Sequence, residues 1–169
     1  MTPDAPAPRV VVLLGVAGSG KTTVGRALAG RLGWAFEDAD DYHSPAANRK
    51  MARGAGLTDA DRAPWLARLA RLVGERAEAG PPTVLACSAL RARYRRQLGA
   101  GRPGVAWVWL DVPPAVLAAR LARRRGHVAG PDLLPSQLDA FEPPRDALRL
   151  DGTRPPAELA DDVAAALGL

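Results

Sequence analysis

A glycine-rich segment with one lysine carries the clearest chemical signal in the sequence. Residues 15–22 read Gly-Val-Ala-Gly-Ser-Gly-Lys-Thr, which satisfies the pattern G-x-x-x-x-G-K-[ST]. In such a segment successive backbone N–H groups converge on phosphate oxygens, the lysine reaches the β- and γ-phosphates, and the final hydroxyl can bind Mg²⁺. We therefore predict that Lys21 holds the phosphates of a bound nucleotide and that Thr22 is a metal ligand.

The elements on either side of this segment are those that a phosphate-binding loop requires. The β-branched run at 10–14 predicts a strand buried on both faces, and apolar residues at helical spacing after the loop, ending at Gly33, predict a helix. A chance glycine-rich turn would not be expected in this context. We predict that the nucleotide is bound by Gly15, Ala17, Gly18, Ser19, Gly20, Lys21, Thr22 and Thr23.

The rest of the chain alternates short strands with helices. We expect strands at 35–38, 83–87, 105–110 and 147–150, and helices at 46–53, 61–79, 91–98, 114–125 and 156–167. This alternation is typical of an α/β domain with a parallel sheet and helices on both faces. We predict a five-stranded parallel sheet in a single domain, residues 10–169, after a flexible tail at 1–9.

Composition narrows the class of protein. The chain has 169 residues, enough for one domain, and no uninterrupted apolar run approaches the roughly 18 residues of a membrane span. The N-terminal residues lack the apolar core of a secretory signal, so we expect a cytoplasmic protein. The single cysteine, Cys87, excludes an intramolecular disulfide, and its apolar neighbours indicate a buried structural thiol. The net charge of +5 is compatible with binding either nucleic acid or the phosphates of a nucleotide, and charge alone does not distinguish the two.

Lysine is scarce in this sequence. Of the 23 basic residues, Lys21 and Lys50 are the two lysines and the rest are arginines. A compact ammonium group fits a tight phosphate cradle better than the wide guanidinium fork does, which explains Lys21. Lys50 has two interpretations, a substrate contact or a local salt bridge.

A phosphate-binding loop predicts nucleotide binding but not the fate of the γ-phosphate. A regulatory GTPase would need an Asn-Lys-x-Asp type segment to read guanine, and the sole asparagine, Asn48, is not in one. A carboxylate just beyond the second strand could accept a proton from a substrate hydroxyl or hold a Mg²⁺-bound water. Asp40 is the candidate for this role. Turn or capping roles are the alternative for Asp38, Asp40 and Asp41.

Several further motifs make the chain resemble the gluconokinase family. They are Asp38-Ala39-Asp40-Asp41-Tyr42-His43, Asn48-Arg49-Lys50-Met51, the run 54–62, Pro64-Trp65-Leu66, Ala86-Cys87-Ser88-Ala89-Leu90, Tyr94-Arg95, Arg120-Leu121 with Arg124, Gly126-His127, Leu133-Leu134, Ser136-Gln137 and Glu142-Pro143. The resemblance spans nearly the whole chain after residue 9. It implies a P-loop kinase fold with a substrate-binding segment at about 40–65 and a mobile lid at about 120–137.

The resemblance also implies an activity. It implies that the protein, with Mg²⁺, transfers the γ-phosphate of ATP to the 6-hydroxyl of gluconate and gives 6-phosphogluconate. One alternative is a kinase of the same fold that acts on another small acid, such as shikimate. The other is a nucleotide-gated protein that binds nucleic acid through its basic surface. The preferred interpretation includes no nucleic-acid or membrane partner, and it leaves a homodimer open.

The same resemblance assigns side chains to the reaction. A sugar acid needs cations for its carboxylate and hydrogen-bonding groups for its hydroxyls. The implied substrate contacts are Asp40, His43, Lys50, Arg62, Ser88, Arg95, Arg124, His127 and Gln137, and the implied catalytic residues are Lys21, Asp40, Arg120 and Arg124. A capping role for the two histidines and a solvated position for Arg62 are the alternatives.

Two expectations concern the nucleotide side of the domain. Arg120 and Arg124 are four residues apart, so we expect them on one helix face, where lid arginines could stabilise the charge of the transferred group. The apolar run at 107–110 ends at Asp111, for which a helix cap before Pro113 is preferred over a Walker B role. By analogy with related kinases, residues 151–154 contact adenine.

Overall fold

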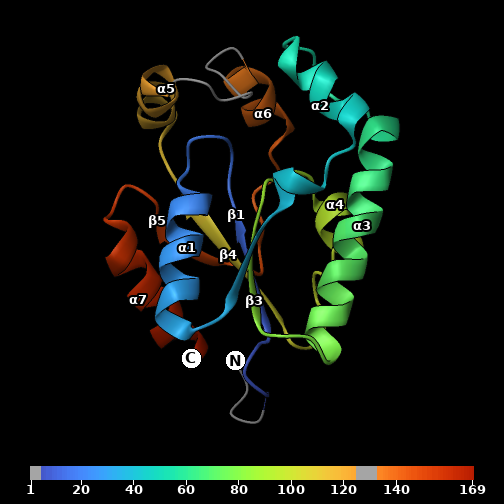
Figure 1. Ribbon diagram of the computed structural model, residues 1–169. Helices are drawn as coiled ribbons and strands as arrows, with labels where there is room; N and C mark the ends of the chain where they lie inside the picture. Colours follow the sequence, from blue (N-terminus) through green and yellow to red (C-terminus); the bar gives the residue numbers. More distant parts are fainter. Residues whose placement is uncertain (1–4, 125–132) are drawn as a thin grey trace.

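A five-stranded parallel sheet forms the centre of the domain, with the strand order β2-β3-β1-β4-β5 (Figure 1). The computed structural model describes residues 5–124 and 133–169. The strands are β1 (Val10–Leu14), β2 (Ala35–Asp38), β3 (Thr83–Cys87), β4 (Val105–Asp111) and β5 (Leu148–Asp151). The predicted α/β class and the five parallel strands are confirmed.

The central strand β1 is buried on both faces. It pairs with β3 on one side and β4 on the other. Val10, Val12 and Leu14 pack into one hydrophobic cluster, whereas Val11 and Leu13 pack into a second. Because neither face meets solvent, this strand has the unbroken apolar sequence of a buried parallel strand.

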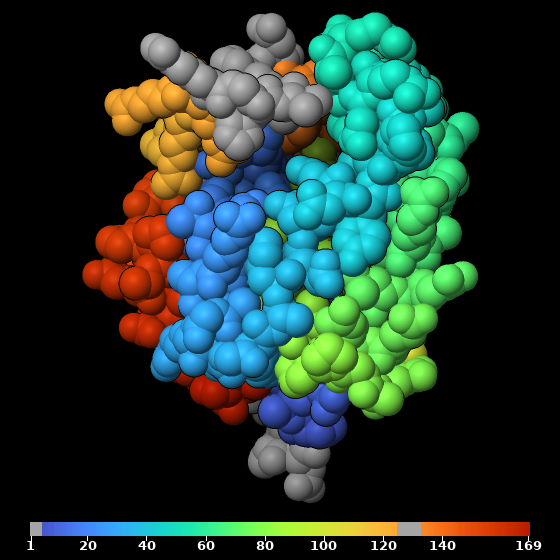
Figure 2. All heavy atoms as spheres, viewed as in Figure 1, coloured from blue at the N-terminus to red at the C-terminus, as the bar shows by residue number. Residues whose placement is uncertain are grey.

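Helices cover both faces of the sheet. On one face lie α1 (Lys21–Leu32) and α7 (Pro156–Leu167), and on the other lie α3 (Asp59–Glu78) and α4 (Ala92–Gln97) (Figure 1). The space-filling view shows α1 and α7 on one flank and α3 on the opposite flank (Figure 2). Among the described residues, no helix has both the length and the apolar character of a membrane span.

Four short helices gather at the carboxyl ends of the strands (Figure 1). They are the 3₁₀ helix η1 (Ala39–Tyr42), α2 (Pro45–Ala52), α5 (Pro114–Arg123) and α6 (Leu134–Ala140). Since β1 lies between β3 and β4, the chain order reverses beside it, and such a switch point opens a crevice at the carboxyl edge of the sheet. The phosphate-binding loop follows β1 and enters this crevice.

The structure differs from the sequence predictions at two places in this region. The sequence predicted no helix between residues 125 and 156, but α6 begins at Leu134, whose buried side chain packs with Val16, Leu117 and Leu121. A seven-residue helix is too short to show a clear 3.6-residue period. The second difference is that α5 ends at Arg123 rather than at residue 125. Residues 125–132 of the predicted lid, His127 among them, lie outside the described residues.

Candidate active site

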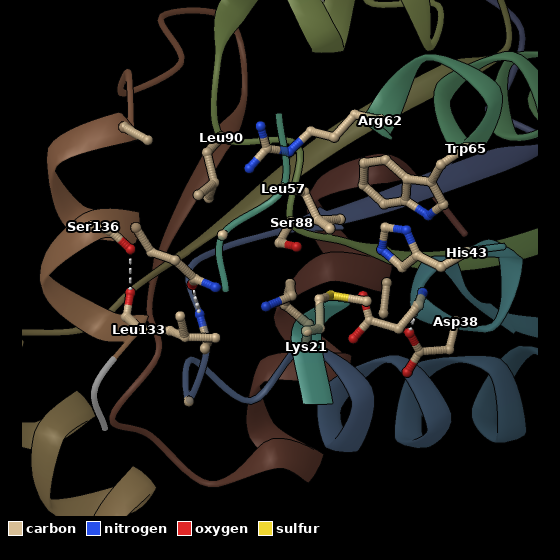
Figure 3. A pocket seen from close by; sticks show the side chains of 18 of the residues that line it. Lys21, Asp38, His43, Leu57, Arg62, Trp65, Ser88, Leu90, Leu133 and Ser136 are labelled. Carbon is tan, nitrogen blue, oxygen red and sulfur yellow. Dashed lines mark hydrogen bonds between the residues drawn. The ribbon is translucent and has the colours of Figure 1, made fainter. Parts of the chain in front are cut away.

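The loops at the carboxyl edge of the sheet enclose a cavity of about 540 Å³. This volume is within the range of roughly 300–1,000 Å³ that is usual for small-molecule sites. Side chains converge on it from α1, from the turn after η1, from α3 and from the end of β3 (Figure 3). The predicted site residues that line it are Ala17, Gly18, Gly20, Lys21, Thr22, Asp40, His43, Arg62, Ser88, Arg124 and Gln137.

The phosphate-binding loop has a backbone that requires its glycines. Gly18 and Gly20 have positive φ angles of 86° and 93°, which side-chain-bearing residues rarely adopt. A Cβ atom on Gly15 would lie 2.3 Å from the Oγ of Ser19, whose side chain is buried beneath the loop. Thr23, also predicted to bind the nucleotide, is exposed on α1 and does not line the cavity.

Lys21 and Thr22 begin α1 at the floor of the cavity. The Lys21 ammonium donates a hydrogen bond to the Val16 carbonyl oxygen at 3.0 Å, so it lies folded over the loop. The Thr22 hydroxyl donates to Asp38 Oδ2, also at 3.0 Å. A hydroxyl beside a carboxylate supplies the oxygen ligands that Mg²⁺ takes together with substrate phosphates and waters. These residues therefore fit a magnesium-nucleotide.

Asp40 faces the same floor from η1. Its backbone N–H donates to Asp38 Oδ1 at 3.0 Å, so Asp38 caps the turn that carries it. Desolvation in the cavity raises the pKa of Asp40, repulsion from Asp38 adds to this, and the Lys21 ammonium opposes it. Desolvation also lowers the pKa of Lys21, against the attraction of the carboxylates. A carboxylate with a raised pKa beside a cation has the properties of a general base.

His43 and Trp65 form a stacked pair on one wall of the cavity (Figure 3). Their ring centroids are 4.5 Å apart and their planes differ by 11°. Desolvation lowers the pKa of His43 to about 4, and the nearby Arg62 and Arg68 contribute. Its buried Nδ1 has no hydrogen-bond partner among the described residues. At neutral pH this wall therefore presents an uncharged imidazole.

Arg62 is a cation in the cavity lining, three residues before Trp65 on α3. Its Nη1 lies 3.4 Å from the Tyr94 hydroxyl and 3.9 Å from Asp59 Oδ1. The Tyr94 hydroxyl is itself hydrogen-bonded to Asp59, which also pairs with Arg93. The long contact to Asp59 leaves guanidinium donors available to an anion in the cavity. Arg62 was predicted as a substrate contact with a solvated surface position as the alternative, and its place in the cavity lining favours the first.

The structure does not bring Arg95 to the cavity, which corrects its predicted substrate contact. Its side chain is 5% exposed. The guanidinium donates to the carbonyl oxygens of Ala89 and Leu90 at 2.9 Å and to that of Glu142 at 2.6 Å. Three backbone acceptors use its donors, so Arg95 has a structural role that joins the loop after β3 to the segment after α6.

Lys50 also lies outside the cavity lining, and its local alternative is the observed one. Its ammonium is 2.6 Å from Asp61 Oδ2. Asp61 forms a capping box with Thr58 at the start of α3. The hydrogen bonds from Lys50 and Thr58 lower the pKa of Asp61 to about 2. Lys50 therefore ties α2 to the N-terminus of α3.

Arg120 and Arg124 are separated by the end of α5, so the prediction that they share a helix face is wrong. Arg124 has an extended conformation after the helix and lines the cavity. Arg120 instead donates to the carbonyl oxygens of Gly18 at 3.1 Å and Gly152 at 2.9 Å. It joins the phosphate-binding loop to the loop at 151–154, where we expected adenine.

Two further expectations can be compared with the structure. Asp111 does not cap a helix: Pro113 occupies the N-cap of α5, and the Asp111 carboxylate pairs with Arg149. The interpretation of Cys87 as a buried structural thiol is confirmed. Burial raises the pKa of Cys87 to about 12, so it is a thiol at neutral pH.

Several cavity residues were missed by sequence reasoning. Leu57 and Leu90, which lie within the family motifs, and Arg91, which follows one, line the cavity but were not predicted as site residues. Asn48, the first residue of the motif Asn48-Arg49-Lys50-Met51, lines it as well, although no substrate contact was predicted for it. Their positions in or beside the motifs were a usable signal, but the sequence alone does not tell which side of a turn faces inward.

Comparisons with known proteins agree with this geometry. Residues 10–144 match a family model described as an AAA domain. A gluconokinase of Gluconobacter oxydans is 47% identical over 152 residues, 88% of this chain and 85% of the relative. An unliganded sugar kinase from Janibacter sp. HTCC2649 is 41% identical with a TM-score of 0.86, covering 96% of this chain and 95% of that one. A gluconokinase structure from Sinorhizobium meliloti is 39% identical with a TM-score of 0.81, covering 95% and 92%. The chain belongs to the gluconokinase family.

Proposed function

We propose that this protein transfers the γ-phosphate of ATP to the 6-hydroxyl of D-gluconate, giving ADP and 6-phospho-D-gluconate. One observation carries the proposal. Lys21 at the phosphate-binding loop, Asp40 on η1 and Arg62 on α3 all line the same cavity. A nucleotide phosphate and an anionic acceptor would meet there.

The nucleotide side of the proposal rests on α1 and the loop before it. Backbone N–H groups of the loop and the N-terminus of α1 would bind the phosphates, and the Lys21 ammonium would leave the Val16 carbonyl oxygen to reach them. Thr22 and Asp38 would hold Mg²⁺ directly or through water. When bound, the metal supplies charge neutralisation between the β- and γ-phosphates.

The acceptor side of the proposal lies in the segment 40–65 and at the end of β3. Arg62 would bind the carboxylate, because a guanidinium forms strong charge-assisted hydrogen bonds. His43, uncharged at neutral pH, and Ser88 would exchange hydrogen bonds with the hydroxyls. A site that pairs several hydroxyls rejects analogues that lack them, since its polar groups would then be buried without partners.

Asp40 is the proposed general base. The acceptor oxygen forms a bond to the γ-phosphorus as the bond from that phosphorus to the β-phosphate oxygen breaks. The hydroxyl proton passes to the Asp40 carboxylate. Lys21 and Arg124 would stabilise the charge on the transferred phosphoryl group, which is the main contribution that a protein makes to this reaction.

The test is ADP release by the purified protein with Mg²⁺-ATP over a panel of acceptors. The panel comprises D-gluconate, other aldonates, shikimate, glucose and nucleoside monophosphates. We expect turnover with gluconate well above that with the others, and the product should carry phosphate at the 6-position by ³¹P and ¹³C NMR. Turnover of another acid with none of gluconate would refute the assigned substrate and leave the kinase mechanism.

A further inference from the structure

Gln137 joins helix α6 to the phosphate-binding loop at the edge of the cavity. Its Oε1 accepts a hydrogen bond from the backbone N–H of Ala17 at 2.7 Å. The two residues are 120 positions apart in the chain. Both line the cavity, so this bond connects its nucleotide side with α6.

The bond also determines which end of the Gln137 amide is available. A backbone N–H can be met only by the carbonyl end of the amide, so the Nε2 end retains both of its donors. Within residues 5–124 and 133–169, no hydrogen bond from Nε2 is present. The side chain is half-buried at the cavity. A ligand oxygen is the natural acceptor for an amide held in this way.

Helix α6 is packed against both sides of the site. At its start, buried Leu134 packs in the cluster that contains Val16 of the phosphate-binding loop. Just after its end, the Glu142 backbone N–H donates to the Leu90 carbonyl oxygen at 2.8 Å, and the Arg95 guanidinium donates to the Glu142 carbonyl oxygen. Leu90, two residues after Ser88 in the sequence, also lines the cavity. A shift of the phosphate-binding loop would therefore be transmitted to the acceptor wall through α6.

We infer that Gln137 is a positioning residue that couples nucleotide binding to acceptor binding. Its Oε1 holds the phosphate-binding loop at Ala17, and its Nε2 donates a hydrogen bond to an oxygen of the acceptor. Each ligand then fixes the amide in the orientation that the other needs. This inference rests on the proposed function for the identity of the acceptor.

The coupling has a measurable size. Linkage requires that nucleotide strengthen acceptor binding by the same factor by which the acceptor strengthens nucleotide binding. One hydrogen bond oriented in this way corresponds to a factor of about three to ten. A residue that only stabilised the fold would change both affinities without removing the factor between them.

The experiment is a calorimetric measurement of gluconate affinity with and without saturating Mg²⁺ and a non-hydrolysable ATP analogue. It compares the wild type with Gln137→Met, which removes both hydrogen bonds at similar volume, and Gln137→Glu, which keeps an acceptor for Ala17 but has no donor. Gln97→Met is the matched control, because Gln97 is the chain's other glutamine and is exposed on α4.

We expect coupling of about three- to tenfold in the wild type and in Gln97→Met, and less than about twofold in both Gln137 variants. Coupling that survives in Gln137→Met, or a wild type without coupling, would overturn the inference. Coupling that survives in Gln137→Glu would overturn the assigned donor. The proposed function is judged separately by wild-type turnover of gluconate: normal turnover with unchanged coupling in Gln137→Met refutes the coupling alone.

Discussion

The Trp65 indole holds the turn that carries the candidate base: its Nε1–H donates a 2.6 Å hydrogen bond to the carbonyl oxygen of Ala39. Both residues are buried, at 4% and 1% exposed. Ala39 lies between Asp38 at the end of β2 and Asp40 on η1, so a residue on α3 helps to determine where these two carboxylates lie. The same indole supports the His43 ring by stacking.

Replacing Trp65 with Phe should therefore lower kcat more than it raises either KM. Phe keeps an aromatic ring against His43 but leaves the buried Ala39 carbonyl oxygen without its donor, at a cost of about 1–3 kcal/mol in the free energy of unfolding. We expect kcat to fall about tenfold as Asp40 loses its fixed position, an effect measurable by steady-state kinetics and urea denaturation. Trp34→Phe is the control, because Trp34 packs beside the opposite face of the sheet. Equal kcat values for both variants would contradict this role.

The second prediction concerns Asp40→Asn. The amide cannot accept the hydroxyl proton, so kcat should fall by about 10²- to 10⁴-fold while the calorimetric affinity for Mg²⁺-ATP is largely retained. Because the pKa of Asp40 is raised in the free protein, wild-type kcat/KM should decrease as the pH falls through that pKa and the base becomes protonated. The variant's residual activity should lack this acid limb. Near-normal turnover in the variant would exclude the base role.

The stability of the protein should depend on pH through His43. The folded protein holds the pKa of His43 at about 4, against about 6.5 for an unfolded chain. Between these values the unfolded state binds more protons, so the free energy of unfolding decreases as the pH falls from about 6.5 toward 4. Urea denaturation at pH 7 and pH 5 should show this loss in the wild type and a smaller one in His43→Asn. An equal loss of stability in the wild type and in His43→Asn would show that groups other than His43 cause it.

Asp61 provides an internal contrast to this prediction. Its pKa of about 2 lies below the ordinary value of 3.8. Its stabilising contribution is therefore present above about pH 4 and is lost as the pH falls toward 2. The two residues affect stability in different pH windows.

The cations Arg62 and Lys50 should behave differently when each is replaced by Met. Arg62→Met removes a guanidinium from the cavity, and we expect the KM for gluconate to rise about tenfold or more. Lys50→Met removes a partly exposed salt bridge to Asp61, which should cost less than about 1 kcal/mol of stability and change the KM less than about twofold. Steady-state kinetics with gluconate as the varied substrate separates the two. A larger KM effect from Lys50 would restore its predicted substrate contact.

Arg95→Lys should destabilise the fold. A lysine ammonium is compact and cannot match the planar fork that reaches three carbonyl oxygens, so we expect a loss of about 2–3 kcal/mol in the free energy of unfolding. Arg96→Lys, at the exposed neighbouring position, should change stability by less than about 0.5 kcal/mol. Urea denaturation measures both. A raised KM for gluconate with unchanged stability would instead indicate a substrate contact at Arg95.

The strands, the phosphate-binding loop and the family could all be predicted from the sequence. These signals are local: the loop is one contiguous motif, and burial on both faces makes a strand such as β1 an unbroken apolar run. The positive φ angles at Gly18 and Gly20 are also a local requirement, because the turn of the loop itself needs residues that can adopt them. Local signals of this kind can be read without knowing what packs against them.

Which polar side chains face the cavity could be established only once the folded arrangement was known. Arg62, Lys50 and Arg95 are all basic residues in family motifs, but only Arg62 of the three lines the cavity. Lys50 forms a salt bridge with Asp61, and Arg95 donates a hydrogen bond to the Glu142 carbonyl oxygen. The orientation of the Gln137 amide is determined by its hydrogen bond from the Ala17 backbone N–H, 120 residues away. A side chain's role depends on the hydrogen-bond partners that folding brings to it. These partners can come from distant segments, and a single sequence does not show which segments will be in contact.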